Sequence, residues 1–217
     1  RVGVFSDSHV VNNTAKLAKA LDTYQTIDPN MKMGMTGDII YQNEDINADP
    51  SAKNLPERYD TFLNLYKEKG FSIDNSVYAM GNHEFVQNAT SAEKYDAINA
   101  ESKALFTQKT GLAPNHVKTW NGYTFIAASP DSYSNNMSAQ SESWVLEQIR
   151  AAEAASADKP IFYFQHQPLY NTVYGSTSVN PNSEGFLTEL AKHPRVIVLT
   201  AHCHYAAHDP RSIWQGG

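Results

Sequence analysis

Five short apolar runs in this chain each lead directly into Asp, Asn or His, and this recurrence constrains the fold more than any other feature. Each run has the length and composition of a buried β-strand, and helical patterns separate most of the runs. Alternating strands and helices indicate an α/β fold, whose sheets bind ligands beyond the carboxyl ends of the strands. The runs are VGVF (2–5), MGMT (33–36), VYAM (77–80), IFYF (161–164) and VIVL (196–199).

The polar residues after these runs are of the types that bind metal ions. A single histidine after a strand is usually an ordinary loop residue, but five strand ends with carboxylate, amide and imidazole groups favour one shared site. Asp and Asn supply oxygen ligands, and neutral His supplies nitrogen ligands for transition metals. The residues are Asp7, His9, Asp38, Asn82, His83, Glu84, His166, His202 and His204.

The last of these segments, TAHCHYAAH (200–208), holds three histidines and the only cysteine of the chain. If the segment continues the strand before it, its side chains alternate between two faces. His202 and His204 then share one face and Cys203 takes the other. We therefore expect His202 and His204 to be metal ligands and Cys203 to be a small packing residue on the far face.

The length of the chain suits one α/β domain with a full hydrophobic core. At 217 residues, and with no internal repeat or linker to divide it, the chain is expected to form a single domain over 1–217. An Asn-Gly turn at 121–122 predicts a β-hairpin of residues 116–120 and 124–129. One cysteine cannot form an intrachain disulfide, so no disulfide framework holds the fold.

Charge and composition limit the partners. The formal net charge of −6 argues against binding long nucleic acids or anionic membranes. No apolar stretch approaches the roughly 20 residues that a membrane span needs. Asn, Ser and Thr number 50 against 17 Lys and Arg, which favours a secreted or cell-surface protein over a cytoplasmic one. Because an apolar strand begins directly after Arg1, we expect the chain to be a processed or trimmed part of a longer polypeptide.

Taken together, the motifs resemble those of the calcineurin-like metallophosphoesterase superfamily. Its pattern is Asp-x-His, Gly-Asp, Gly-Asn-His-Glu/Asp, His and Gly-His-x-His, and the matches follow this order over residues 7–204. They are DSH (7–9), GD (37–38), GNHE (81–84), His166 and AHCH (201–204). The resemblance implies a four-layered α/β/β/α sandwich. The family usually has further strands after its last motif, and this chain has room only for RSIWQ (211–215), so we expect a sandwich that is incomplete at its C-terminus.

The resemblance also implies a dinuclear metal centre. One ion would be held by Asp7, His9, Asp38 and His204, and the other by Asp38, Asn82, His166 and His202. Asp38 bridges both, since only a carboxylate offers two strong oxygen donors across the roughly 3.5–4 Å that separate paired metals in phosphatases. The nitrogen and oxygen ligands, with no thiolate, allow divalent or trivalent Mn, Fe, Zn or Co.

Such a centre implies hydrolysis of phosphomonoesters or phosphodiesters. A hydroxide that bridges the metals attacks phosphorus, because coordination lowers the pKa of water from about 15.7 to roughly 7. His83 would donate a proton or a hydrogen bond to the leaving oxygen. Glu84 would either orient His83 or lie in a solvated loop. Two divalent ions, with Asp7, Asp38 and the hydroxide, leave a local charge of about +1, so an acidic protein can still attract phosphate.

The expected substrate is a small phosphorylated molecule, with nucleotides, cyclic nucleotides and lipid or sugar phosphates all open. Tyr133, Tyr170 and Tyr174 lie in polar loops where one of them could stack on a nucleobase. The alternative to an enzyme is a non-catalytic, metal-binding scaffold of the same fold. Scaffold members typically lose ligands or the catalytic histidine, and this chain retains all of them. A nuclease of long DNA is disfavoured by the acidic charge.

Ala201 and Tyr41 are not part of the usual family pattern. Ala201 stands where the family usually has glycine, and alanine would cost about 1 kcal/mol or more if the position requires a positive φ. Tyr41 completes GDIIY (37–41), which is similar to a purple acid phosphatase motif whose tyrosine binds metal. Those enzymes lack the histidine of DSH, so we expect Tyr41 to be an aromatic wall of the pocket. His208 is a candidate for the pocket rim or the surface.

Overall fold

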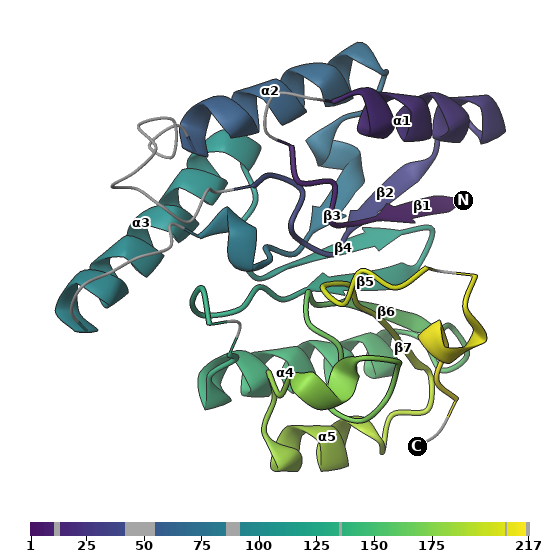
Figure 1. Ribbon diagram of the computed structural model, residues 1–217. Helices are drawn as coiled ribbons and strands as arrows, with labels where there is room; N and C mark the ends of the chain where they lie inside the picture. Colours follow the sequence, from purple (N-terminus) through teal and green to yellow (C-terminus); the bar gives the residue numbers. More distant parts are fainter. Residues whose placement is uncertain (11–13, 42–54, 86–91, 135, 207, 216–217) are drawn as a thin grey trace.

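Two β-sheets pack face to face between two layers of helices in the computed structural model of the chain (Figure 1). The structure describes residues 1–10, 14–41, 55–85, 92–134, 136–206 and 208–215. These residues contain five α-helices and seven strands. The layers follow the order helix, sheet, sheet, helix, which confirms the predicted α/β/β/α sandwich.

The first half of the sandwich is a three-stranded parallel sheet under three helices. Helices α1 and α2 are amphipathic and bury one face against the sheet, since their apolar residues recur at helical spacing. The strands are β1 (Val2–Phe5), β2 (Lys32–Met35) and β3 (Ser76–Tyr78), in that order across the sheet. The helices are α1 (Ala15–Ile27), α2 (Leu55–Glu68) and α3 (Ala92–Thr110).

The second half is a four-stranded sheet covered by two helices. Its first two strands form an antiparallel hairpin, and the remaining pairs are parallel. The strands are β4 (His116–Trp120), β5 (Tyr123–Ala127), β6 (Ile161–Phe164) and β7 (Val196–Leu199), in that order. The helices are α4 (Ala139–Ala155) and α5 (Glu184–Leu190).

A thin apolar layer joins the two sheets. Val77 of β3 packs against Phe125 of β5 and Phe164 of β6 in a buried cluster. A Cβ on Gly34 would lie 2.3 Å from the ring of Phe164, so glycine is required for this close approach. The packing holds the carboxyl ends of β1, β2, β3, β6 and β7 at one edge of the sandwich, where the predicted ligands follow.

The predicted hairpin is confirmed, and no strand forms at 211–215, where the sequence left room for one more. Asn121 and Gly122 have φ of 52° and 77°, the left-handed pair that a tight hairpin turn requires. Residues 211–215 form no strand. Asp209 and Pro210 start a short 3₁₀ turn instead, because the Asp209 carboxylate accepts the N–H of Arg211 and proline suits a first helical position. In the described part of the chain no helix is long and apolar enough to cross a membrane.

Candidate metal centre

The loop after β1 runs beside the loop after β2. The N–H of Asp7 donates to the carbonyl of Gly37 at 3.1 Å, and the N–H of His9 donates to the carbonyl of Asp38 at 3.1 Å. These backbone bonds continue the pairing of the two strands beyond their regular ends. They bring the motifs DSH and GD together at the edge of the first sheet.

The backbone is strained at the predicted ligands. In the described residues, seven non-glycine residues have a left-handed backbone, and five of them are predicted ligands. Asp and His enter this region more readily than most residues, but it still costs about 1–2 kcal/mol each time. Strain concentrated in one place is typical of a functional site. The five are Asp7, His9, Asp38, His202 and His204, with φ between 45° and 69°.

The prediction of an extended segment at 200–204 is wrong. Strand β7 ends at Leu199, and His202 and His204 both have left-handed backbone conformations. The N–H of Cys203 donates to the carbonyl of Ala201 at 2.8 Å, which closes a tight turn. The two histidines therefore reach the site from a turn and not from one face of a strand. Cys203 is half-buried beside that turn, so its predicted place on the far face of a strand is also wrong.

Ala201 does not have the backbone strain that would arise if this position required a left-handed glycine. Its φ lies outside the positive range, so alanine meets no left-handed strain there. Its N–H donates to the carbonyl of His166 at 2.7 Å, which keeps the loops after β6 and β7 side by side. The departure from the family pattern leaves the ligand geometry intact.

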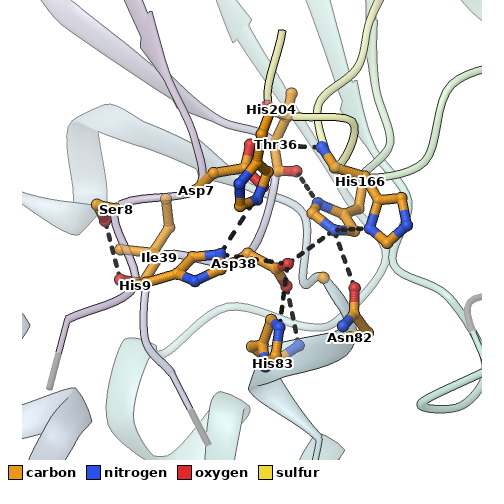
Figure 2. A network of polar contacts seen from close by, with 12 residues as sticks. Asp7, Ser8, His9, Thr36, Asp38, Ile39, Asn82, His83, His166 and His204 are labelled. Atoms are coloured by element: carbon orange, nitrogen blue, oxygen red, sulfur yellow. Dashed lines mark hydrogen bonds and ion pairs between the residues drawn. The ribbon is translucent and has the colours of Figure 1, made fainter. Parts of the chain in front are cut away.

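Four predicted ligands meet around the ring of His166, and we call Asp38, Asn82, His166 and His202 the buried group. The side chains of His166 and Asp38 are only 1% and 2% exposed. His166 Nε2 lies 3.0 Å from Asp38 Oδ2, 3.1 Å from Asn82 Oδ1 and 3.1 Å from His202 Nδ1 (Figure 2). His166 Nδ1 donates to the carbonyl of Thr36 at 2.7 Å, which orients Nε2 toward the other three.

The charges within the buried group are strongly coupled. Burial alone would raise the pKa of Asp38, but the charge and hydrogen bond of His166 outweigh it and hold that pKa well below its usual range. Burial would lower the pKa of His166, whereas Asp38 raises it to about 9. Burial and the charge of His166 lower the pKa of His202 to about 4. Without metal, the raised pKa of His166 and the lowered pKa of Asp38 favour an ion pair of these two side chains within the buried group.

The remaining ligands form a more accessible cluster, and we call Asp7, His9 and His204 the open group. His204 Nε2 lies 3.1 Å from Asp7 Oδ1, and its side chain is 54% exposed. His9 Nε2 lies 4.0 Å from Asp7 Oδ1 and 3.6 Å from Asp38 Oδ2. The open group therefore touches the buried group through Asp38.

Two buried atoms of the open group fit a bound cation. Asp7 Oδ1 and His9 Nε2 are both buried, and neither has a hydrogen-bond partner in the structure. The nearby nitrogen of His204 does not satisfy the carboxylate oxygen with hydrogen-bond geometry. An unpaired buried polar atom costs about 1–3 kcal/mol, and a metal ion would engage both atoms at once. The residues present therefore fit the metal that the sequence implies.

The structure brings all eight predicted site residues into one network (Figure 2). In three groups the nitrogen and oxygen donors lie within 4.8 Å of one another and could hold an ion. Two of them contain three of the four residues of a predicted ligand set; the first lacks Asp38, and the second lacks Asn82, which contacts His166. The groups are Asp7 with His9 and His204, Asp38 with His166 and His202, and His9 with Asp38 and His83.

His83 lies beside the shared carboxylate. Its backbone N–H donates to Asp38 Oδ1 at 2.8 Å, and its Nε2 lies 3.9 Å from Asp38 Oδ2. The ring packs against Tyr41 with centroids 4.5 Å apart, and Tyr41 also stacks on His9 at 5.3 Å. Tyr41 thus lines the site as the expected aromatic wall.

Glu84 is not a solvated loop residue, and that prediction is wrong. The residue is 0% exposed, and its carboxylate accepts the N–H groups of Asp38 and Gly81 at 2.9 and 2.6 Å. Burial and the charge of Asp38 raise the pKa of Glu84, whereas the hydrogen bonds of Tyr78 and Gly81 oppose that shift. Neither this role of Glu84 nor the Thr36 carbonyl that orients His166 was predicted from the sequence. The buried environment of Glu84 arises from contacts between loops far apart in the chain.

The loop tyrosines differ in their availability. Tyr133 packs against the core of the first half, so its ring is not free to stack on a ligand. Tyr170 and Tyr174 are exposed. Tyr174 packs on Tyr205, which follows the ligand His204, with centroids 4.2 Å apart, and the guanidinium of Arg211 lies 3.7 Å from the Tyr174 ring.

Comparison with known families agrees with this arrangement. The family model of the calcineurin-like phosphoesterases matches residues 1–206 of the chain. The chain belongs to this family. A calcineurin-like phosphoesterase is a metal-dependent hydrolase of phosphate esters, and the described Asp and His clusters could bind the metal. A comparison with curated protein sequences gave no match.

Proposed function

We propose that this calcineurin-like phosphoesterase binds two metal ions and hydrolyses small phosphomonoesters or phosphodiesters. The buried group would hold one ion, and the open group together with Asp38 would hold the other. One observation carries the proposal: Asp38 Oδ2 lies 3.0 Å from His166 Nε2 and 3.6 Å from His9 Nε2, so a single carboxylate faces both groups. A shared carboxylate is how two-metal hydrolases hold paired ions.

The residues supply a centre that favours anions. When bound, the metal ions supply Lewis acidity and lower the pKa of coordinated water toward neutrality. Asp38 stays ionised because its pKa is held well below the usual range. The other ligands are one further carboxylate, four imidazoles and one amide, so the ligands cancel only part of the metal charge and the remainder attracts phosphate. These nitrogen and oxygen donors fit Mn, Fe, Zn or Co.

His83 is the proposed proton donor to the leaving oxygen. Its side chain is 13% exposed and lies beside Asp38 without joining the donors around His166. Its backbone bond to Asp38 and the ring of Tyr41 hold the imidazole at the edge of the centre. A positioned imidazole typically contributes about 10²–10⁴-fold to the rate through general acid catalysis.

The proposed substrate is a small phosphate ester, with a nucleotide as one candidate. Tyr205 follows His204 and packs on Tyr174, and both rings are exposed, which supports an aromatic leaving group near the open group. The net charge of −6 disfavours long nucleic acids. A monoester and a diester with the same leaving group differ in the second ester group on phosphorus, so a comparison of two such substrates measures the preference.

Assays with p-nitrophenyl phosphate and bis-p-nitrophenyl phosphate in Mn²⁺ test this proposal. We expect hydrolysis of at least one substrate, loss of activity in chelator, and recovery when metal is restored. His193→Ala is a matched control, because His193 pairs with Glu153 away from the centre and should leave the rate unchanged. Bound metal without turnover of any phosphate ester would instead support the scaffold alternative.

A further inference from the structure

The carboxylate of Glu84 is completely enclosed and fully used as an acceptor. The residue is 0% exposed, and both of its oxygens accept hydrogen bonds. Four of the five donors are backbone N–H groups and the fifth is a phenol. Oε1 accepts from Ile39 N at 2.8 Å, Ile40 N at 3.3 Å and Tyr78 Oη at 2.7 Å, and Oε2 accepts from Asp38 N at 2.9 Å and Gly81 N at 2.6 Å.

These donors come from two different ligand loops. Residues 38–40 belong to the loop after β2, which carries the shared ligand Asp38. Gly81 belongs to the loop after β3, which carries Asn82 and His83. One carboxylate therefore ties together loops that are more than forty residues apart in sequence.

The hydrogen bonds of Glu84 link the two loops at a place where the packing leaves little room for movement. Asp38 holds a left-handed φ of 52°, and its own N–H is bound by Glu84. A Cβ on Gly81 would lie 2.3 Å from Asp38 Oδ1, so the two loops are already at closest approach. The same Asp38 oxygen accepts the N–H of His83 at 2.8 Å. A shift of either loop would move Asp38 relative to both His83 and Asn82.

We infer that Glu84 is a positioning residue that sets the place of Asp38 relative to Asn82 and His83. The inference rests on the proposed function, since it concerns the same metal centre. Glu84 acts through the backbone of the ligand loops and does not touch metal or substrate. Partners that orient metal ligands in this way typically change metal affinity or activity by about 10–100-fold when altered.

Glu84→Gln tests the inference with little change in volume. The glutamine side chain replaces one carboxylate oxygen with an NH₂ group, which cannot accept a hydrogen bond. This NH₂ group must therefore face either the N–H of Ile39 or the N–H of Asp38, and that N–H loses its acceptor. We expect Mn²⁺ affinity to fall by roughly 10–100-fold in calorimetry. The N–H groups of Asp38 and Ile39 should also exchange faster with solvent in the metal-free protein.

Glu142→Gln is the matched control. Glu142 is also buried, at 6% exposed, and it accepts the N–H and the hydroxyl of Ser183 at 2.6 Å each, outside the metal centre. Both variants should lower the melting temperature, but only Glu84→Gln should weaken metal binding. Equal metal affinity in wild type and folded Glu84→Gln, or an equal loss in Glu142→Gln, would overturn the inference.

Tyr78→Phe keeps the inference testable if Glu84→Gln does not fold. The change removes only the hydroxyl that donates to Glu84 Oε1 at 2.7 Å. We expect a smaller, severalfold loss of Mn²⁺ affinity, and an unchanged affinity would contradict the positioning role. Wild type is measured first in every case, because a wild-type protein that binds no metal rejects the proposed function itself.

Discussion

The two groups of predicted ligands on either side of Asp38 differ in how far their histidines are exposed to solvent. In the buried group the side chain of His166 is 1% exposed and is fixed by the carbonyl of Thr36. In the open group the side chain of His204 is 54% exposed. Both histidines nevertheless approach a carboxylate oxygen to about the same distance, 3.0 Å for His166 and 3.1 Å for His204. The histidine–carboxylate distances are therefore similar in the two groups, and the difference lies in the exposure of the histidines.

This contrast assigns different tasks to the two groups. A ligand set that is enclosed and already oriented should hold its ion tightly, because little ordering remains to be done on binding. A ligand set that faces solvent can exchange its ion and admit substrate. We therefore expect the ion of the buried group to be the more tightly held, and phosphate to approach from the side of His204.

Asp38→Asn should have the largest effect, because it breaks both groups at once. Loss of the shared carboxylate should reduce bound metal from about two ions to less than one per chain. Turnover should fall by more than about 10³-fold, since the metals supply several kcal/mol of transition-state stabilisation. Elemental analysis and initial rates measure the two quantities. Asp60→Asn removes an exposed carboxylate paired with Lys109 and should change neither.

His83→Ala should slow turnover without emptying either group. The expected loss is roughly 10²–10⁴-fold, with about two metal ions retained. The defect should be smaller for a nitrophenyl ester than for an alkyl ester, because nitrophenolate leaves without a proton. Rates for both esters and metal content decide the matter. Loss of metal, or an equal defect for all leaving groups, would refute the proton-donor role.

His166→Ala and His204→Ala compare the groups directly. If four ligands share about 10–16 kcal/mol of binding, one ligand contributes about 3 kcal/mol, or roughly 10²-fold in affinity. His166→Ala should lose this full amount, because the ring is only 1% exposed and the carbonyl of Thr36 already orients it toward the other predicted ligands. His204→Ala should lose only about 10-fold, because water can reach the vacated position. Calorimetry with Mn²⁺ measures the affinity of both variants. Equal losses of affinity would contradict the difference between the buried and the open group.

The pH dependence of metal binding is the smallest expected effect. The pKa of His166 is about 9 in the metal-free protein, so near pH 7.5 its ring is protonated and must lose that proton to bind metal. The pKa of His202 is about 4, so it has no proton to release. Affinity should therefore rise as pH increases toward about 9. Calorimetry in buffers of different ionisation enthalpy should show about one proton released, and no release would contradict the assignment.

The same proton affects the stability of the metal-free fold. The pKa of His166 is raised above its ordinary value of 6.5. Its pairing with Asp38 is therefore fully stabilising below about pH 6.5 and is lost as pH rises through about 9. Melting temperatures of chelated protein should fall across this window, and the fall should be absent in His166→Ala.

Local patterns predicted the strands and the polar residues after them, and the family resemblance predicted the layers and the metal ligands. Each predicted ligand lies within a few residues of the end of an apolar strand, so the pattern that predicts the strand also places the residue near its carboxyl end. The turn at Asn121-Gly122 was predictable because both residues favour a left-handed backbone. Alternation could not reveal the turn at His202 and His204, since it assumes that the strand continues past Leu199.

The burial of Glu84 could not be predicted from its neighbours in sequence. Its carboxylate is satisfied by Asp38, Ile39 and Ile40, which lie more than forty residues earlier in the chain. A glutamate after a strand looks like any solvated loop residue until the two loops meet. Long-range backbone contacts, and not composition, decide its environment.

A Mn²⁺ titration that follows bound metal and hydrolysis together tests the central claim most directly. We expect two ions per chain, a tighter one in the buried group and a weaker one in the open group, with hydrolysis rising as the weaker site fills. Saturation at one ion per chain, or full hydrolysis before a second ion binds, would contradict a centre in which two groups share Asp38.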